Sequence, residues 1–228
     1  MTISQTKFIK FKELFYGGNP MKKFLSLFLS FSLLVTIAAC SREEPMTELE
    51  SIQKQLAEME GYTCTAILTR TNDRGTQTYE TKQYYKSTGE YRLELTAPEN
   101  VAGNYTIFDG DRICQYNPKL NSSVIKDIPE SQHRNELFLG QFISNYMQSE
   151  GVSVETAALD ESRCIVLEAI IPGNDSDLSS EKLWADRETL LPVRFVIYDT
   201  NGKEIYKMDY TSFAFNPQFD DALFTIEE

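Results

Sequence analysis

The chain has 228 residues, of which 22 are basic and 34 acidic, and its formal net charge is −12. A surface of this charge repels phosphate backbones and anionic lipid headgroups, so the composition argues against nucleic acid as a partner. A negatively charged surface of this kind attracts a cationic surface on a partner protein.

The first 40 residues have the outline of a bacterial export signal. A basic pair, Lys22 and Lys23, is followed by an apolar run over 24–38, which is shorter than the roughly 20 residues that span a bilayer. Small residues then lead to Cys40 in an Ile-Ala-Ala-Cys sequence, which resembles a lipobox. The pattern predicts a removable signal peptide over 21–39 and a mature chain that begins with the cysteine.

The lipobox resemblance implies that the sulfur of Cys40 carries a diacylglyceryl group and that the new amino terminus is often acylated as well. Two acyl chains hold a protein stably at a membrane, because burying hydrocarbon contributes about 0.8 kcal/mol per CH₂. The predicted location is therefore outside the cytoplasm, with the protein anchored to a membrane by lipid. The alternative is a plain secretory signal whose cleavage site happens to lie beside a cysteine.

Residues 1–20 precede a second methionine, Met21, which stands where an export signal should begin. The codons of Gly17 and Gly18 can form a purine-rich ribosome-binding site just upstream of it. We therefore expect that Met1 is a mis-called start. Five of the 22 basic and one of the 34 acidic residues precede the lipobox cysteine, so the predicted mature chain has a net charge near −16.

Residues 40–46 are predicted to form a short polar tether and residues 47–228 a single domain. Thr47 and Glu50 fit a capping box, which predicts a helix to about residue 59, and Gly61 is placed to end it. The apolar residues of this helix recur at helical spacing: Leu49, Ile52, Leu56 and Met59.

From Tyr62 the apolar period changes to two, and turn residues separate the segments. Asn201-Gly202 predicts a two-residue hairpin turn between the last two segments. Six strands are predicted first, near residues 62–70, 76–86, 91–96, 104–109, 112–117 and 122–127. A broadly apolar helix follows over about 134–148, and five further strands are predicted near 152–159, 164–171, 181–186, 193–199 and 204–213.

Eleven antiparallel strands with two or three helices predict a mainly β (α+β) fold, a half-open and strongly curved antiparallel barrel. The helix over 134–148 has too wide an apolar face for a surface helix, so we expect it to plug the sheet. Val196 and Tyr198 lie on the strand face opposite Phe195 and Ile197. The late strands are therefore predicted to be covered on both faces or to expose an apolar patch.

Three cysteines follow the lipobox, namely Cys64, Cys114 and Cys164. An odd number in an exported protein leaves at least one thiol unpaired. Cys64 alternates with apolar residues on one strand face, so a buried and inert thiol is predicted there. One disulfide among the three is the alternative, and the sequence does not select the pair.

Three stretches resemble the LolA and LolB lipoprotein-carrier superfamily, whose members fold as a half-open barrel of about eleven strands covered by helices. Within them, Pro192 is predicted to open an edge strand, Phe224 to anchor the tail, and Trp184 to lie in the core or in a cavity wall. The stretches are Tyr91-Arg92-Leu93-Glu94 through Phe108-Asp109-Gly110-Asp111 to Tyr116-Asn117-Pro118, then Leu183-Trp184-Ala185-Asp186 with Leu191-Pro192-Val193-Arg194-Phe195, and Asn216-Pro217 with Phe219-Asp220-Asp221-Ala222-Leu223-Phe224.

Within that superfamily the chain resembles the GerS-like germination lipoproteins of spore-forming clostridia. The resemblance lies in the lipobox, the opening helix, Tyr62-Thr63-Cys64, the strand from Tyr79 to Tyr85, and Tyr91-Arg92-Leu93-Glu94. It implies a non-enzymatic protein that binds and supports a spore-cortex N-acetylmuramoyl-L-alanine amidase, which prepares peptidoglycan for muramic-δ-lactam formation. It also implies a location at the forespore membrane or in the spore envelope, but it identifies no contact residue.

The residues offer no recognisable catalytic, cofactor or metal set. His133 is the single histidine and lies in a polar stretch, so a solvated or helix-capping role is predicted. No CxxC, HExxH, GxSxG or phosphate-binding glycine pattern occurs, and we therefore predict no enzyme activity. The acid pairs Asp160-Glu161 and Asp220-Asp221 could serve a glycosidase, but adjacent acids more often lie in turns or at helix starts.

Two functions of different classes follow. The first is a lipid-tethered docking module for the amidase. The second is a carrier or acceptor of lipid or lipoprotein acyl chains, which needs an apolar cavity that the helix over 134–148 can itself fill. An envelope-stress sensor domain is a third alternative.

Overall fold

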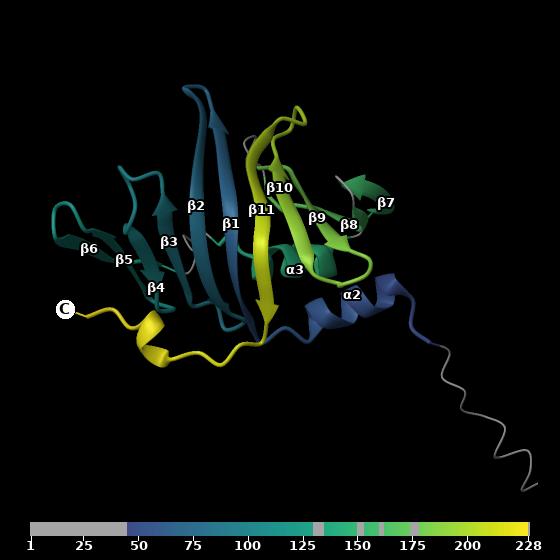
Figure 1. Ribbon diagram of the computed structural model, residues 1–228, viewed down its shortest axis with the longest axis horizontal. Coiled ribbons are helices and arrows are strands. Elements are labelled where there is room, and N and C mark those ends of the chain that lie inside the picture. Colours follow the sequence, from purple (N-terminus) through teal and green to yellow (C-terminus); the bar gives the residue numbers. More distant parts are fainter. Residues whose placement is uncertain (1–44, 130–134, 150–152, 160–161, 174–177, 228) are drawn as a thin grey trace, which may run out of the picture. The chain divides into compact units, whose positions relative to one another are not determined.

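The computed structural model describes residues 45–129, 135–149, 153–159, 162–173 and 178–227 (Figure 1). Residues Met46–Glu228 form one compact unit. The predicted lipid attachment site at Cys40, the histidine His133 and the acid pair Asp160-Glu161 lie outside the described residues.

Eleven strands and two α-helices make up the described unit, as the fold class predicted. The helices are α2 (Glu48–Ala57) and α3 (Leu139–Gln148), and a 3₁₀ turn, η2 (Asp221–Phe224), follows the last strand. The strands are β1 (Gly61–Asn72), β2 (Gly75–Lys86), β3 (Tyr91–Ala97), β4 (Tyr105–Phe108), β5 (Arg112–Asn117), β6 (Ser122–Asp127), β7 (Ser153–Leu159), β8 (Ser162–Ile170), β9 (Ser180–Asp186), β10 (Pro192–Tyr198) and β11 (Glu204–Phe215).

All eleven strands belong to one antiparallel sheet in the order β6-β5-β4-β3-β2-β1-β11-β10-β9-β8-β7. Apart from β6 and β7, which are the two edges, strands that follow each other in the chain are neighbours, and β1 pairs with β11 in the middle of the sheet. Helix α3 lies between the two edge strands in the chain. Figure 1 shows the sheet curving around α3, so we call the α3 side of the sheet its inner face and the opposite side its outer face.

Side-chain alternation explains why these segments form strands. On β9, Glu181, Leu183 and Ala185 are buried on the inner face, while the residues between them are only half-buried. The same alternation gives β1 its buried residues Cys64 and Ala66. A period of two with one covered face is what an antiparallel sheet with one buried side requires.

The capping box at the start of α2 is confirmed, but the predicted role of Gly61 is wrong. Thr47 accepts from the amide of Glu50, whose carboxylate accepts from the Thr47 amide at 2.7 Å. The helix ends at Ala57, and Gly61 is the first residue of β1. A Cβ at residue 61 would lie 2.5 Å from the carbonyl oxygen of Tyr85, so the close approach of β2 requires the glycine.

Two turn and edge predictions are also corrected. The β10–β11 hairpin holds three residues between its closing pair, because the Asp199 amide donates to the Lys203 carbonyl at 3.0 Å. The Asp199 carboxylate accepts from the Asn201 and Lys203 amides, which favours the longer turn. Pro192 opens β10, but β10 is an interior strand between β9 and β11, and the proline is tolerated where the register shifts.

The three cysteines Cys64, Cys114 and Cys164 are all buried and free, so the alternative of a disulfide among them is not found. Burial raises the pKa of the Cys64 thiol, as expected for an inert group. Cys114 lies in a small outer-face cluster with Ile107, which Ile226 of the C-terminal tail covers. The predicted anchor Phe224 is buried beside this tail.

Candidate functional site

Stacked aromatic rings fill the inner face where α3 enters. Tyr62 and Tyr85 of the sheet stack at 5.4 Å between ring centroids, and Tyr85 stacks on Phe138 at 5.7 Å. Phe138 also stacks on Tyr91 of β3 at 4.2 Å. These rings join the sheet to the start of α3. The predicted plugging helix is confirmed, but it begins at Leu139 and not near residue 134.

Contacts along α3 leave little space beneath it. Leu139 and Phe142 are completely buried, and Phe142 packs edge-on against Phe195 of β10. At Gly140 a Cβ would lie 1.8 Å from the Tyr85 hydroxyl, so only a glycine lets the helix approach this closely. An acyl chain bound at the inner face would have to displace these side chains.

The Tyr62 hydroxyl caps the first turn of α3. It accepts from the Leu139 amide at 3.3 Å and donates to the Gln83 side chain at 3.2 Å. Phe138, the N-cap residue, has no side chain that could cap the helix, so the tyrosine supplies the missing acceptor. Burial raises the pKa of Tyr62 well above its usual value, which keeps the hydroxyl protonated.

A buried carboxyl makes the second polar attachment of α3. Glu181 of β9 is fully buried, and its Oε1 accepts from the Asn145 side-chain amide at 2.8 Å. Its Oε2 has no hydrogen-bond partner among the described residues. Burial raises the pKa of this carboxyl to about 7, against the smaller opposing effect of the Asn145 hydrogen bond.

Sequence reasoning missed Glu181, although a signal for it exists. The residue stands two positions before Leu183 and four before Ala185, so strand parity places its side chain on the apolar face. Its carboxyl bonds to an amide and not to a second acid or a nucleophile. The arrangement therefore attaches a helix to a sheet and lacks the paired groups of acid–base catalysis.

An uncharged hollow lies at the other end of the sheet, over β3, β4, β5 and β6. It encloses about 410 Å³, and none of its eleven lining residues is acidic, basic or histidine. Its apolar surface comes from Leu93, Leu95, Leu120 and Val124. Side chains with amide and hydroxyl groups supply the rest of the lining. Leu120 and Val124 are 72% and 54% exposed and are among the exposed large apolar side chains of the described residues.

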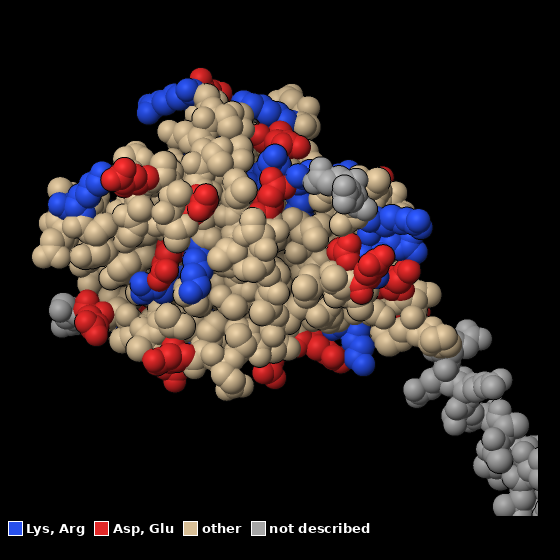
Figure 2. Space-filling model, viewed as in Figure 1, with Lys and Arg blue, Asp and Glu red and all other residues tan. Residues whose placement is uncertain are grey.

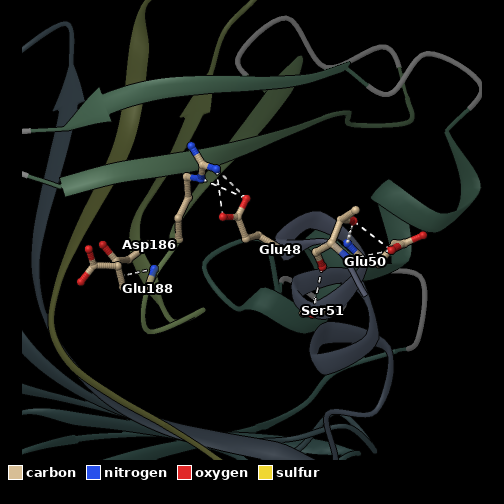
Figure 3. A network of polar contacts seen from close by, with 7 residues as sticks. Glu48, Glu50, Ser51, Asp186 and Glu188 are labelled. Carbon is tan, nitrogen blue, oxygen red and sulfur yellow. Dashed lines mark hydrogen bonds and ion pairs between the residues drawn. The ribbon is translucent and has the colours of Figure 1, made fainter. Parts of the chain in front are cut away.

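Charged residues line a second hollow, where α2 meets the turn after β9. Arg187 forms a bidentate ion pair with Glu48, in which Nε donates to Oε2 at 3.1 Å and Nη2 donates to Oε1 at 2.9 Å (Figure 3). In the same turn the Asp186 carboxylate accepts from the amides of Glu188 and Thr189. These contacts fix the start of α2 to the sheet, so this network has a structural role.

The outer face carries both signs of charge. Figure 2 shows acidic and basic side chains interspersed on the face that it views. Arg92 pairs with Glu94 at 2.6 Å, and Lys182 lies between Glu155 and Glu168. Val196 is buried and Tyr198 is half-buried on this face, so at β10 the structure shows the first of the two predicted alternatives, a strand covered on both faces.

The remaining predicted residues take structural positions. Asp220 caps η2 by accepting from the Ala222 amide, and Asp221 pairs with Lys86 at 3.0 Å. This agrees with the expectation that these acids lie at a helix start. Trp184 lies on the outer face, because its neighbours Leu183 and Ala185 point inward, and it is half-buried there. It therefore lines neither the main core nor an inner cavity.

The described part of the chain contains no cluster of three or more side chains that could hold a metal ion. Neither described helix combines the length and the apolar character of a membrane span.

A family model described as Sporulation protein YdcC-like matches residues 21–224. The chain belongs to this family. The YdcC-like family includes the sporulation protein YdcC of Bacillus subtilis strain 168, which is 20% identical over 199 residues. The match covers 87% of this chain and 58% of that relative, so the chain spans little more than half of the relative's length.

Solved structures resemble this YdcC-like protein over most of its length. An uncharacterized conserved protein from Thermus thermophilus has a TM-score of 0.50 at 16% identity, covering 79% of this chain and 93% of that chain. The structure of the CwlD amidase from Clostridioides difficile in complex with the GerS lipoprotein contains a chain with a TM-score of 0.46 at 27% identity, covering 77% and 99%. The LolA superfamily protein NE2245 from Nitrosomonas europaea has a TM-score of 0.40 at 15% identity, covering 80% and 99%.

The predicted resemblance is found, because a GerS-containing complex and a LolA superfamily protein are among the similar solved structures. The family that is shown is the YdcC-like sporulation family, and the eleven-stranded open sheet confirms the predicted fold class.

Proposed function

We propose that this YdcC-like protein is an extracytoplasmic lipoprotein that acts in spore formation by docking a cortex N-acetylmuramoyl-L-alanine amidase. In this proposal residues 1–20 lie upstream of the true start and 21–39 are a signal peptide. The lipid is attached to Cys40, the tether spans 40–46, and the domain spans 47–228. Family membership supports the role in sporulation, and the GerS-like motifs support the amidase as partner.

The observation that carries the proposal is the plugged inner face. A carrier of acyl chains needs a large apolar cavity. Here Leu139 and Phe142 of α3 occupy the centre of the inner face and are completely buried. The part of the inner face that α3 leaves free is an open hollow over β3 to β6, and an open surface of this kind is better suited to binding a protein than to enclosing a lipid.

A non-enzymatic role agrees with the geometry of the described residues. Glycoside hydrolysis needs two carboxyl groups that face one sugar across a few ångströms. Glu181 bonds to Asn145, and Asp221 pairs with Lys86 on the surface. Glu181 is used in attaching α3 to the sheet, and Asp221 lies in an exposed surface ion pair.

The test is a deletion in sporulating cells, combined with co-purification of the amidase. We expect the native lipoprotein to co-purify with the amidase and spores that lack it to have lost muramic-δ-lactam from their cortex. Normal cortex chemistry in the deletion strain would contradict the proposal. Native mass spectrometry of the purified protein separates the carrier alternative, because a carrier would retain lipid in its inner face.

A further inference from the structure

The uncharged hollow over β3 to β6 is the part of the inner face that α3 leaves open. Register pairing places Leu93, Thr106, Gln115 and Val124 side by side across the four strands. Gln115 and Val124 are exposed, whereas Tyr91, two residues from Leu93, is buried beneath Phe138. The part of the inner face that α3 and Phe138 cover therefore ends within the region formed by strands β3 to β6.

The hollow continues to a free sheet edge. β6 is the last strand of the sheet in the described chain, so its edge opposite β5 pairs with no strand there. Its inner-face residue Val124 lines the hollow, and Leu120 projects from the β5–β6 turn beside it. An extended segment that pairs with β6 would place every second side chain over this apolar surface.

The charge around the hollow differs from that of the whole chain. Lys126 lies two residues from Val124 and therefore on the same face of β6, and Lys119 precedes Leu120 in the turn. Both lysines belong to a chain whose net charge is −12. A segment that combines apolar residues with a carboxylate is complementary to this edge, while the acidic remainder of the protein repels it.

We propose that β6 and the adjoining hollow bind an extended segment of the partner protein by strand addition. Alternate apolar side chains of the segment enter the hollow beside Val124 and Leu120, and an acidic side chain faces Lys126. The inference rests on the proposed docking function and adds to it the surface, the binding mode and the chemistry of the partner segment.

The test compares Val124→Asp with Val154→Asp in the full chain. Val154 is a matched control, because it lies on the opposite edge strand β7 and is 42% exposed. Titration calorimetry with the purified cortex amidase should show at least tenfold weaker binding for Val124→Asp and unchanged binding for Val154→Asp. Lys126→Glu should weaken binding about threefold or more and reduce its salt dependence.

The outcomes separate the two proposals. If the wild-type protein does not bind the amidase, the docking function fails and this inference fails with it. If the wild-type binds and Val124→Asp binds equally well, the docking function stands and the strand-addition surface is wrong. Two other occupants of the surface are tested at the same time, a second copy of the chain by sedimentation and a membrane by binding to phosphatidylglycerol vesicles. The inference is overturned if Val124→Asp abolishes either of these interactions and leaves amidase binding intact.

Discussion

Gly140 of α3 lies directly against the Tyr85 hydroxyl of the sheet. The helix can rest on the aromatic rings of the inner face because residue 140 has no side chain. In the interior of an exposed helix a glycine costs about 1 kcal/mol relative to alanine. Packing against Tyr85 explains the glycine in the first turn of α3. Helical periodicity over 134–148 predicts the buried Leu139, Phe142 and Tyr146, but neither the buried Asn145 nor the tyrosine that the helix meets.

Gly140→Ala is therefore expected to destabilise the protein, although the same change in an exposed helix is stabilising. A Cβ at this residue would lie 2.3 Å from the Tyr85 ring as well, so the helix or the ring has to move. Overpacking of this kind costs roughly 1–3 kcal/mol. Urea unfolding checks the value, with Ser144→Ala in the same helix as the control; a more stable Gly140→Ala would show that the approach is not tight.

The strands could be predicted closely because two local signals agree. The alternation of apolar and polar residues, together with the turn residues, predicts β5 and β6 at the residues where they occur. The ends of most other strands are predicted to within about two residues, as at β1 and β11. Long-range features could not be predicted in this way. The interior position of Pro192, the role of Gly61 beside β2, and the contact of Glu181 with α3 depend on which strands become neighbours.

At the scale of elements, the burial of Glu181 where β9 meets α3 makes the stability of the fold dependent on pH. The pKa of the carboxyl is raised to about 7 in the folded protein from a usual value of 4.5. The stability that this group contributes is fully present below pH 4.5 and is lost as the pH rises to about 7. The loss approaches roughly 3 kcal/mol, since a tenfold change in an acid constant corresponds to about 1.4 kcal/mol.

Glu181→Gln removes this titration, because an amide has no proton to lose in this range. We expect the variant to gain stability relative to the wild-type protein as the pH is raised from 5 to 8. Urea unfolding at the two pH values measures the difference, and the exposed Glu188→Gln serves as the control. Parallel pH profiles for Glu181→Gln and the wild-type protein would show that the carboxyl is not buried in solution.

At the scale of the whole molecule, the predicted lipid anchor decides where the docking surface operates. The predicted tether 40–46 would span at most about 25 Å when extended. If Cys40 carries the proposed lipid, the domain stays close to the membrane and its partner has to be present at the same membrane surface.

Cys40→Ala is expected to release the protein from the membrane fraction and to abolish the mass gain on the amino-terminal peptide. Fractionation and peptide mass spectrometry measure both effects, with Cys114→Ala as the control because that thiol is buried in the domain. Globomycin should block processing of the wild-type precursor. An unmodified thiol at the amino terminus of the mature protein would contradict the lipobox prediction.

The pairing of β1 with β11 has a cost in chain entropy. Tyr62 pairs with Phe215, and the residues between them contain the rest of the sheet. Closing a loop of this length costs about 4 kcal/mol by the logarithmic rule. Both strands have 12 residues, and the nine residue pairs between them offset that cost. The two halves of the sheet, β1 to β6 and β7 to β11, are therefore held together by the length of the β1–β11 pair. Within each half, neighbouring strands follow each other in the chain and close only short loops.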